Sequence, residues 1–257
     1  MSVQKKQRIL LVLILFWLPI IGGLAPRSSY HFEDKFSEKA SLGQSLRQRG
    51  EFNKAITVFD EALRLASKQN NERSELDCLM QLGILYWNIG QLNDSTSFYK
   101  KAISLSSNLG QKDLEAECAA YIKIYEAYIR GKEACSSGLF KESIAHFNAA
   151  IDLARKMNSP EHELKCLRQM SLNYFQQKDH LNFYTMNSKA LDIAKRLSHR
   201  KEEGRCLNNI GIFYYEIGQY SRALIFYDDA LPVLREAVAN EADLSACLNN
   251  IAGFVTK

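Results

Sequence analysis

The hydrophobic and small residues of this chain recur in one long pattern. In all but one copy a small residue follows an apolar one. In four copies, a second small residue twelve positions later begins a series with an aromatic residue and an alanine. The first small residues are Gly43, Gly83, Gly131, Ser171, Gly211 and Ala252, at separations of 40, 48, 40, 40 and 41 residues. The second series has spacings of four and three, which place its members on one face of an α-helix. A period in this range predicts a solenoid of stacked helical units.

Each copy of the pattern predicts two helices joined by a turn. Seven residues after the first small residue, four copies carry a glycine: Gly50, Gly90, Gly138 and Gly218. Glycine suits the left-handed residue that often ends a helix. The small residues let helices approach closely, and the aromatic residues fill the space between neighbouring pairs. One pair cannot bury its apolar face alone, so we expect the pairs to stack.

The motif of Leu-Gly, Tyr, then Ala, Phe or Tyr, and Ala resembles the tetratricopeptide repeat (TPR) family. The resemblance runs from about Phe36 to the end and is best in repeats one, two and five. The usual TPR period is 34 residues. A period of about 40 makes each helix roughly one turn longer, and this form is similar to the arrays of kinesin light chains, Pins-type polarity scaffolds and bacterial TPR sensor or effector proteins. The resemblance implies an all-α, right-handed TPR solenoid of antiparallel helix pairs.

Repeat four departs from this pattern at three positions. Lys178 replaces the turn glycine, Phe183 replaces a small residue, and Asn187 replaces the aromatic residue. One interpretation is tolerated variation in a redundant array. The other is a local widening of the stack that makes a binding site.

The cysteines follow the same period. Cys78, Cys118, Cys166, Cys206 and Cys247 are 40, 48, 40 and 41 residues apart, and Cys135 alone lies outside this register. Equivalent positions in stacked repeats lie about 10 Å apart, whereas a disulfide needs Cα atoms within about 7 Å. We therefore predict small buried thiols rather than disulfides. The chain has no Cys-x-x-Cys or Cys/His cluster, so no zinc or other metal site is expected.

The spacing of 48 locates an insertion of eight residues within residues 119–130. Eight residues make about two helical turns, so the first helix of repeat three, near residues 112–137, should be overlong. Tyr121, Tyr125 and Tyr128 on the projecting part would then form a contact patch. Packing of the projection against a neighbouring loop is the alternative.

The N-terminus has the parts of an export signal. Lys5, Lys6 and Arg8 precede an apolar run, which ends in small residues up to Ala25. The run of about 17 residues is at the lower limit for a membrane-spanning helix. We therefore predict that residues 1–25 are a signal peptide or an N-terminal membrane anchor, and that residues 26–35 are a linker. The protein is expected to be exported, to the periplasm or the extracellular space, or anchored in a membrane, with membrane contact through residues 9–25 only.

Charge and motifs argue against several functions. Outside the first ten residues the chain has 30 Lys and Arg against 29 Asp and Glu, and this balance gives no reason to expect nucleic-acid binding. No phosphate-binding glycine loop, nucleophile elbow or metalloprotease motif is present. The five histidines share no ligand spacing and mostly fall near expected helix ends, where a solvated side chain is the ordinary state. We therefore expect no enzymatic activity and no cofactor.

What remains is a predicted groove lined by the first helix of each pair. Two positions before the repeated small residue lie Ser41, Gln81, Gln169, Asn209 and Asn250, with Asn208 and Asn249 one residue earlier. A carboxamide both donates and accepts, so a row of them can bind the backbone of an extended peptide. The match of Leu207–Gly211 to the Leu-x-Asn-Leu/Ile-Gly motif of the kinesin-light-chain and Pins arrays implies the same role. The alternative is that these are polar groove residues without a ligand.

Three basic residues on the same helices, Lys165, Arg168 and Arg205, favour an acidic partner. The predicted peptide-binding groove thus comprises Gln81, Lys165, Arg168, Gln169, Arg205, Asn208, Asn209, Asn249 and Asn250. The set of Lys, Asn and Arg that makes the two-carboxylate clamp of chaperone-binding TPRs cannot be assembled from this chain.

The sequence therefore predicts a TPR array over residues 36–257, with five repeats and the first helix of a sixth. Its predicted function is that of a non-enzymatic scaffold that binds a protein or an extended peptide. The alternative is the N-terminal sensing region of a larger bacterial signalling or effector protein, whose kinase, DNA-binding or protease-like module is absent from this chain.

Overall fold

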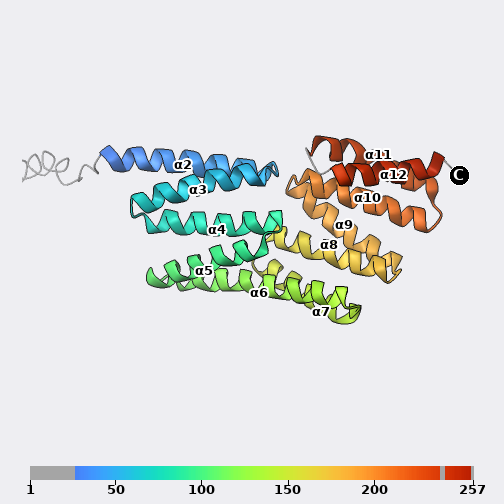
Figure 1. Cartoon of the computed structure of the whole chain (residues 1–257), viewed down its shortest axis with the longest axis horizontal. Helices are drawn as coiled ribbons and strands as arrows, with labels where there is room; N and C mark the ends of the chain where they lie inside the picture. Colours follow the sequence, from blue (N-terminus) through green and yellow to red (C-terminus); the bar gives the residue numbers. More distant parts are fainter. Residues whose placement is uncertain (1–26, 238–240, 256–257) are drawn as a thin grey trace, which may run out of the picture. The chain divides into compact units, whose positions relative to one another are not determined.

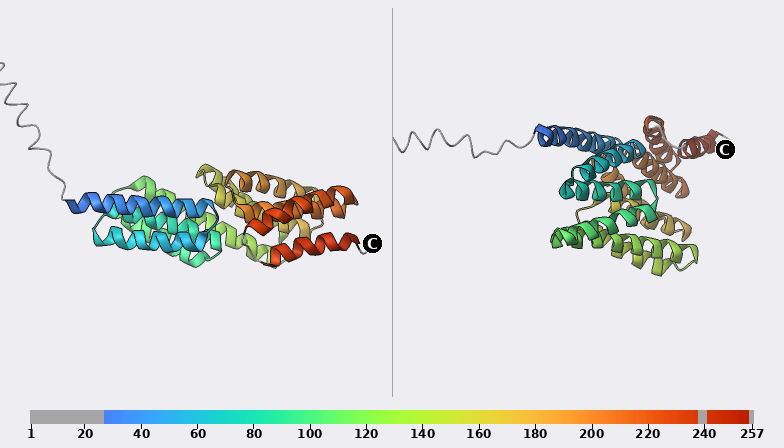
Figure 2. Two further views of the ribbon diagram at one scale, coloured as in Figure 1. Left: turned by 90° about the horizontal axis from the view of Figure 1, so that it is seen from above. Right: turned by 60° about the vertical axis from the view of Figure 1, so that its left-hand side comes forward.

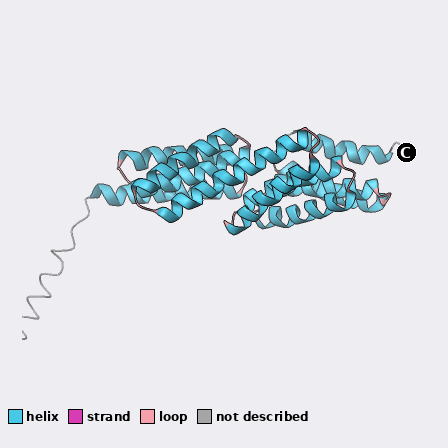
Figure 3. Ribbon diagram, turned by 90° about the horizontal axis from the view of Figure 1, so that it is seen from below, coloured by secondary structure: helices cyan, strands magenta, loops and turns pink. Residues whose placement is uncertain are grey.

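The computed structural model describes residues 27–237 and 241–255, and the described residues form helices joined by short turns (Figures 1 and 3). The predicted signal peptide or anchor, residues 1–25, lies outside this part. The helices are α2 (Arg27–Gln48), α3 (Phe52–Lys68), α4 (Glu72–Ile89), α5 (Leu92–Asn108), α6 (Lys112–Ser136), α7 (Phe140–Lys156), α8 (Pro160–Gln176), α9 (His180–Arg196), α10 (Arg200–Glu216), α11 (Tyr220–Glu236) and α12 (Glu241–Val255). Most of the predicted linker, residues 26–35, is helical, because α2 extends from Arg27 to Gln48.

The chain divides into two compact units, residues 1–38 and residues 39–257. The second unit contains the repeats, and within it each helix packs against the helices before and after it in the sequence (Figure 2). The fold is thus the predicted all-α solenoid of helix pairs. No helix in the described part is both long enough and apolar enough to cross a membrane.

Glycine and aromatic residues hold the two helices of a pair together, as the pattern predicts. A Cβ atom added at Gly43 would lie 2.6 Å from the ring of Phe59, and one added at Gly211 would lie 2.5 Å from the ring of Tyr227. Such distances are below van der Waals contact, so only glycine lets these helices approach so closely. Gly83 and Gly131 make the same contact with Tyr99 and Phe147.

The turn glycines adopt the expected left-handed conformation. Gly50, Gly90, Gly138 and Gly218 have φ between 74° and 86°. Lys178 takes the equivalent place in repeat four with φ of 59°. This conformation is strained for a residue with a Cβ atom, so the chain accepts a small cost at this turn.

Repeat four remains closely packed despite its changes. Asn187 is fully buried, and its Nδ2 donates to Oγ of Ser171 at 2.8 Å and to the carbonyl oxygen of Phe183 at 2.8 Å. A polar contact thus replaces the contact between glycine and an aromatic ring. Phe183 is also buried and packs against Phe175, with ring centroids 5.1 Å apart. The helices of repeat four are therefore closely packed around these residues, and the predicted local widening is not observed there.

The cysteines are free thiols, as predicted. The five that follow the repeat register are buried, and Cys135 is partly exposed. Burial raises the pKa of Cys78 and of Cys206 to about 12. Thiols in this state are protonated and unreactive, which fits a purely packing role.

Helix α6 has 25 residues, whereas the first helices α4, α8 and α10 have 17 or 18. The tyrosines of α6 do not form an exposed patch. Tyr121 and Tyr128 are buried, and the hydroxyl of Tyr125 donates to Oδ1 of Asn93 at 3.1 Å. The patch prediction is wrong because the added turns pack against neighbouring helices on both sides.

Candidate functional site

A cavity of about 650 Å³ is lined by residues of five repeats, including Phe52 and Asn53 at the start of α3. Its walls come from the turn after α2, the end of α4, the second half of α6 and the first turns of α8 and α10. The predicted groove residues Lys165, Arg168, Gln169 and Arg205 line it. The other five predicted residues, Gln81, Asn208, Asn209, Asn249 and Asn250, are not among its lining residues.

The length of α6 accounts for the position of this cavity. Seven or eight additional residues carry the chain about 11–12 Å further along the helix axis before α7 turns back. The first turns of α8 therefore meet the end of α4, two repeats earlier (Figure 1). Nζ of Lys165 donates to the carbonyl oxygen of Trp87, and the ring of His162 stacks on the indole with centroids 4.6 Å apart.

A second contact of this kind joins repeat one to repeat five. The rings of Phe52 and His199 meet edge to face, with centroids 5.6 Å apart. His162 and His199 are buried, which corrects the expectation of solvated histidines. Burial and the neighbouring charge of Lys165 lower the pKa of His162 to about 3, so this imidazole is neutral.

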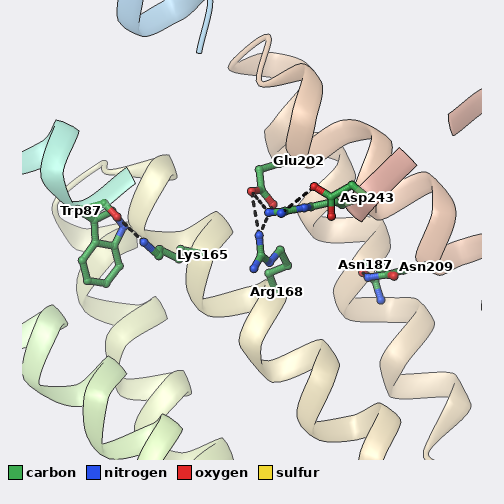
Figure 4. Close-up of polar contacts among 8 residues, drawn as sticks. Trp87, Lys165, Arg168, Asn187, Glu202, Asn209 and Asp243 are labelled. Atoms are coloured by element: carbon green, nitrogen blue, oxygen red, sulfur yellow. Dashed lines mark hydrogen bonds and ion pairs between the residues drawn. The ribbon is translucent and has the colours of Figure 1, made fainter. Parts of the chain in front are cut away.

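The cavity is basic, because seven Lys and Arg residues line it against two glutamates. Part of this charge is neutralised within the protein, because Arg49 forms an ion pair with Glu51 and Arg200 forms ion pairs with Glu203 and Glu236. A further network surrounds Glu202 (Figure 4). Nη1 of Arg168 donates to both carboxylate oxygens of Glu202 at 2.8 Å, and Nη1 of Arg205 donates to Oε1 of Glu202 at 2.9 Å. Arg205 also forms an ion pair with Asp243 at 2.8 Å.

The network joins three successive first helices, α8, α10 and α12. Burial would raise the pKa of Glu202, but Arg168 and Arg205 outweigh it and hold that pKa below its ordinary value. Two arginines and two carboxylates therefore balance one another. Arg168 and Arg205, which were expected to favour an acidic partner, are thus already paired with carboxylates of the protein itself.

The surroundings of the Lys165 ammonium differ from those of the two arginines. In addition to its hydrogen bond to the Trp87 carbonyl oxygen (Figure 4), this ammonium lies 4.9 Å from the ring centroid of Trp87. It also lies 5.9 Å from the ring centroid of Tyr128. Within the described part of the chain no carboxylate lies within ion-pair distance of it. Burial and the nearby charge of Arg168 lower its pKa to about 8.

Two further lysines of the cavity, Lys132 and Lys201, form no ion pair with the described residues. Nζ of Lys132 lies 5.9 Å from the ring centroid of Tyr128, the same ring that Lys165 faces. Burial and Arg205 lower the pKa of Lys201. Neither residue was predicted. Lys132 follows the eight-residue insertion in α6, and this insertion was the one signal in the sequence that pointed to it. Lys201 lies on α10, and no such signal pointed to it.

The carboxamide row makes contacts within the protein itself. Oε1 of Gln81 accepts from Arg47 at 3.0 Å. Nδ2 of Asn209 donates to Oδ1 of Asn187 at 3.0 Å (Figure 4), and Nδ2 of Asn250 donates to Oδ1 of Asn208 at 2.9 Å. These bonds tie one repeat to the next. Asn249 is exposed, and peptide binding by the row stays a prediction.

The described residues contain no group of three or more His, Cys, Asp or Glu side chains placed to hold a metal ion. The chemistry of the cavity is therefore that of ammonium and guanidinium groups, aromatic faces and amides. Such a surface binds anionic groups through charge-assisted hydrogen bonds.

Several solved structures are similar to this chain. BtubC (BKLC) from P. vanneervenii is 18% identical with a TM-score of 0.41, over 80% of this chain and 84% of that one. A STAND signal-transduction ATPase with a tetratricopeptide repeat sensor, from Pyrococcus horikoshii, is 18% identical with a TM-score of 0.47. That match covers 85% of this chain but only 32% of the ATPase. A putative kinesin light chain from Podosopora anserina is 13% identical with a TM-score of 0.40, over 79% and 97% of the two chains.

The sequence itself also matches a known family. No curated protein matches the chain. The family described as Tetratricopeptide repeat matches residues 37–108, which hold repeats one and two, and residues 204–241 in repeat five. These are the repeats in which the small and aromatic residues follow the pattern most closely, and the helix pairs and left-handed turns agree with it. Residues 37–108 and 204–241 are thus tetratricopeptide repeats, and the helix pairs between them continue the same pattern.

Proposed function

We propose that this array binds an acidic segment of another protein in the cavity lined by its first helices. The observation that carries the proposal is that residues of five repeats line one cavity, in which Lys132, Lys165 and Lys201 form no ion pair with the described residues. Tetratricopeptide repeats generally mediate contacts between proteins. A surface of one charge sign attracts partners of the opposite sign and raises their rate of association.

The volume of the cavity also supports a peptide ligand. About 650 Å³ accommodates a few side chains of an extended segment rather than a folded domain. The carboxamides on the first helices lie outside the cavity but along the same set of helices. The residual donors and acceptors of Gln81 and Asn249 are available to the backbone of a segment that continues beyond it.

A peptide library selected on the full chain tests this proposal. We expect the selected peptides to be rich in Asp and Glu. The double variant Lys132→Glu and Lys201→Glu should weaken their binding by at least tenfold. The control variant, Lys141→Glu and Lys189→Glu, changes the net charge equally at exposed positions outside the cavity. Selection of neutral peptides, or equal loss in both variants, would refute an acidic ligand in this cavity.

We also propose that the protein is exported or anchored by its N-terminus. The basic residues before the apolar run, and the small residues after it, support this. Cell fractionation of a C-terminally tagged chain, followed by N-terminal sequencing, is the test. A new N-terminus near Ala25 supports a cleaved signal, and an uncleaved chain in the membrane supports an anchor. An intact chain in the cytoplasm contradicts both.

A further inference from the structure

We propose that one carboxylate of the bound segment docks between the ammonium groups of Lys132 and Lys165, beside Tyr128, and that Glu202 competes with it from inside the cavity. This inference rests on the proposed function, because it names the place where an acidic segment makes its main ionic contact. Nothing in the family match assigns this place, since Lys132 stands on α6, beyond the insertion that distinguishes this chain.

The first argument is that the Lys165 ammonium is partly buried and has no carboxylate partner among the described residues. A half-buried ammonium without a counter-ion is costly, because it loses water without gaining an opposite charge. Lys165 has one accepting partner, the Trp87 carbonyl, and two aromatic faces. An ammonium has three donors, so two remain for a ligand. A carboxylate is the acceptor that would recover most of the lost hydration.

The position of Lys132 is the second argument. Its ammonium and that of Lys165 each lie 5.9 Å from the centroid of the Tyr128 ring. The two positive charges act on each other, since Lys132 contributes to the lowered pKa of Lys165. Lysine side chains have three rotatable donors on a flexible stem, so both can turn toward one carboxylate. Lys132 is exposed, so a ligand from solvent can reach it.

Glu202 shows how this cavity binds a carboxylate, and it also limits the charge available to a ligand. Its two oxygens occupy Arg168 and Arg205, and its side chain remains 22% exposed on the cavity wall. Arg168 lies one turn after Lys165 on α8. A ligand carboxylate at Lys165 therefore feels the negative charge of Glu202 as well as the positive charge of Arg168. Removing the charge of Glu202 should strengthen anion binding at the neighbouring position.

The test measures binding of a hexaglutamate peptide to the full chain by calorimetry, with hexaglutamine as the neutral probe. We expect Lys165→Gln and Lys132→Gln each to weaken hexaglutamate by about tenfold, and Glu202→Gln to strengthen it by about threefold or more. Lys189→Gln, at an exposed position outside the cavity, is the charge-matched control and should change nothing. Circular dichroism shows whether each variant is folded. If Lys165→Gln does not fold, Lys132→Gln still tests the docking position.

The outcomes separate this inference from the proposed function. If hexaglutamate and the library peptides bind the wild type, and the variants at Lys132 and Lys165 bind as well as Lys189→Gln, the docking position is wrong while the proposed function stands. If Glu202→Gln weakens binding, its role as competitor is wrong. If the wild type binds neither hexaglutamate nor any library peptide, the proposed function itself fails.

Discussion

Replacement of Gly211 by alanine tests whether close approach of the helices holds the array together. The added Cβ would lie 2.5 Å from Cε1 and 2.6 Å from Cδ1 of Tyr227. Nonbonded carbon atoms prefer separations of about 3.5–4.0 Å, so the ring or the helix must move by about 1 Å. Tyr227 is only 2% exposed, so its displacement disturbs the residues packed around it.

Two effects of opposite sign decide the result. Alanine stabilises a helix by about 1 kcal/mol relative to glycine, whereas overpacking of a close-packed interior costs about 1–3 kcal/mol. We expect Gly211→Ala to lower the free energy of unfolding by about 1–2 kcal/mol. Gly253 in α12 has no atom within 4 Å of an added Cβ. Gly253→Ala should therefore raise stability, by up to about 1 kcal/mol.

Urea unfolding followed by circular dichroism measures these changes, and a second substitution isolates their cause. Tyr227→Ala alone should cost about 3–5 kcal/mol. In that background the clash is gone, so Gly211→Ala should become stabilising by about 1 kcal/mol. The reasoning is refuted if Gly211→Ala and Gly253→Ala shift the midpoint in the same direction. It is also refuted if the effect of Gly211→Ala is the same with and without the Tyr227 ring.

Three further predictions follow from the buried groups. A thiol titration should find Cys135 reactive in the native protein and six thiols in denaturant, and a lower total in denaturant would reveal a disulfide. Because burial lowers the pKa of His162 to about 3, the unfolded chain takes up a proton below about pH 6.5 that the folded protein does not. Stability should thus fall by about 2 kcal/mol more in the wild type than in His162→Phe between pH 7 and pH 5, and equal slopes in urea unfolding would contradict this. Asn209→Ala should lower stability by about 0.5–1.5 kcal/mol, since the buried Asn187 loses a donor, and an unchanged midpoint would show that this contact contributes nothing.

The fold was predictable because its determinants are close in sequence. The contact between a glycine and an aromatic ring joins residues sixteen positions apart, as in Gly43 and Phe59, and it recurs with the period of the repeat. The register of the buried cysteines follows from the same period. Repetition makes each determinant visible several times, so a departure such as Asn187 did not obscure the pattern.

The candidate site was predicted only in part, because its contacts join repeats that are two to four apart. Lys165 was identified from its place on a first helix, but its partner Trp87 lies 78 residues earlier. No periodic spacing connects these two positions. The pairing of Asn250 with Asn208 was missed for a related reason, since the pattern shows which residues share a face but not which of them bind each other.

The contacts that cross between distant repeats also affect how the array unfolds. A solenoid whose units touch only their immediate neighbours behaves as a row of linked segments, and local damage remains local. Here Trp87 supports α8 directly, and Phe52 meets His199 at the start of α10. Melting of the first two repeats would therefore remove support from the fourth and fifth at the same time. The longer helix α6 thus converts a modular row into a more cooperative structure, in which distant repeats are lost together rather than one after another.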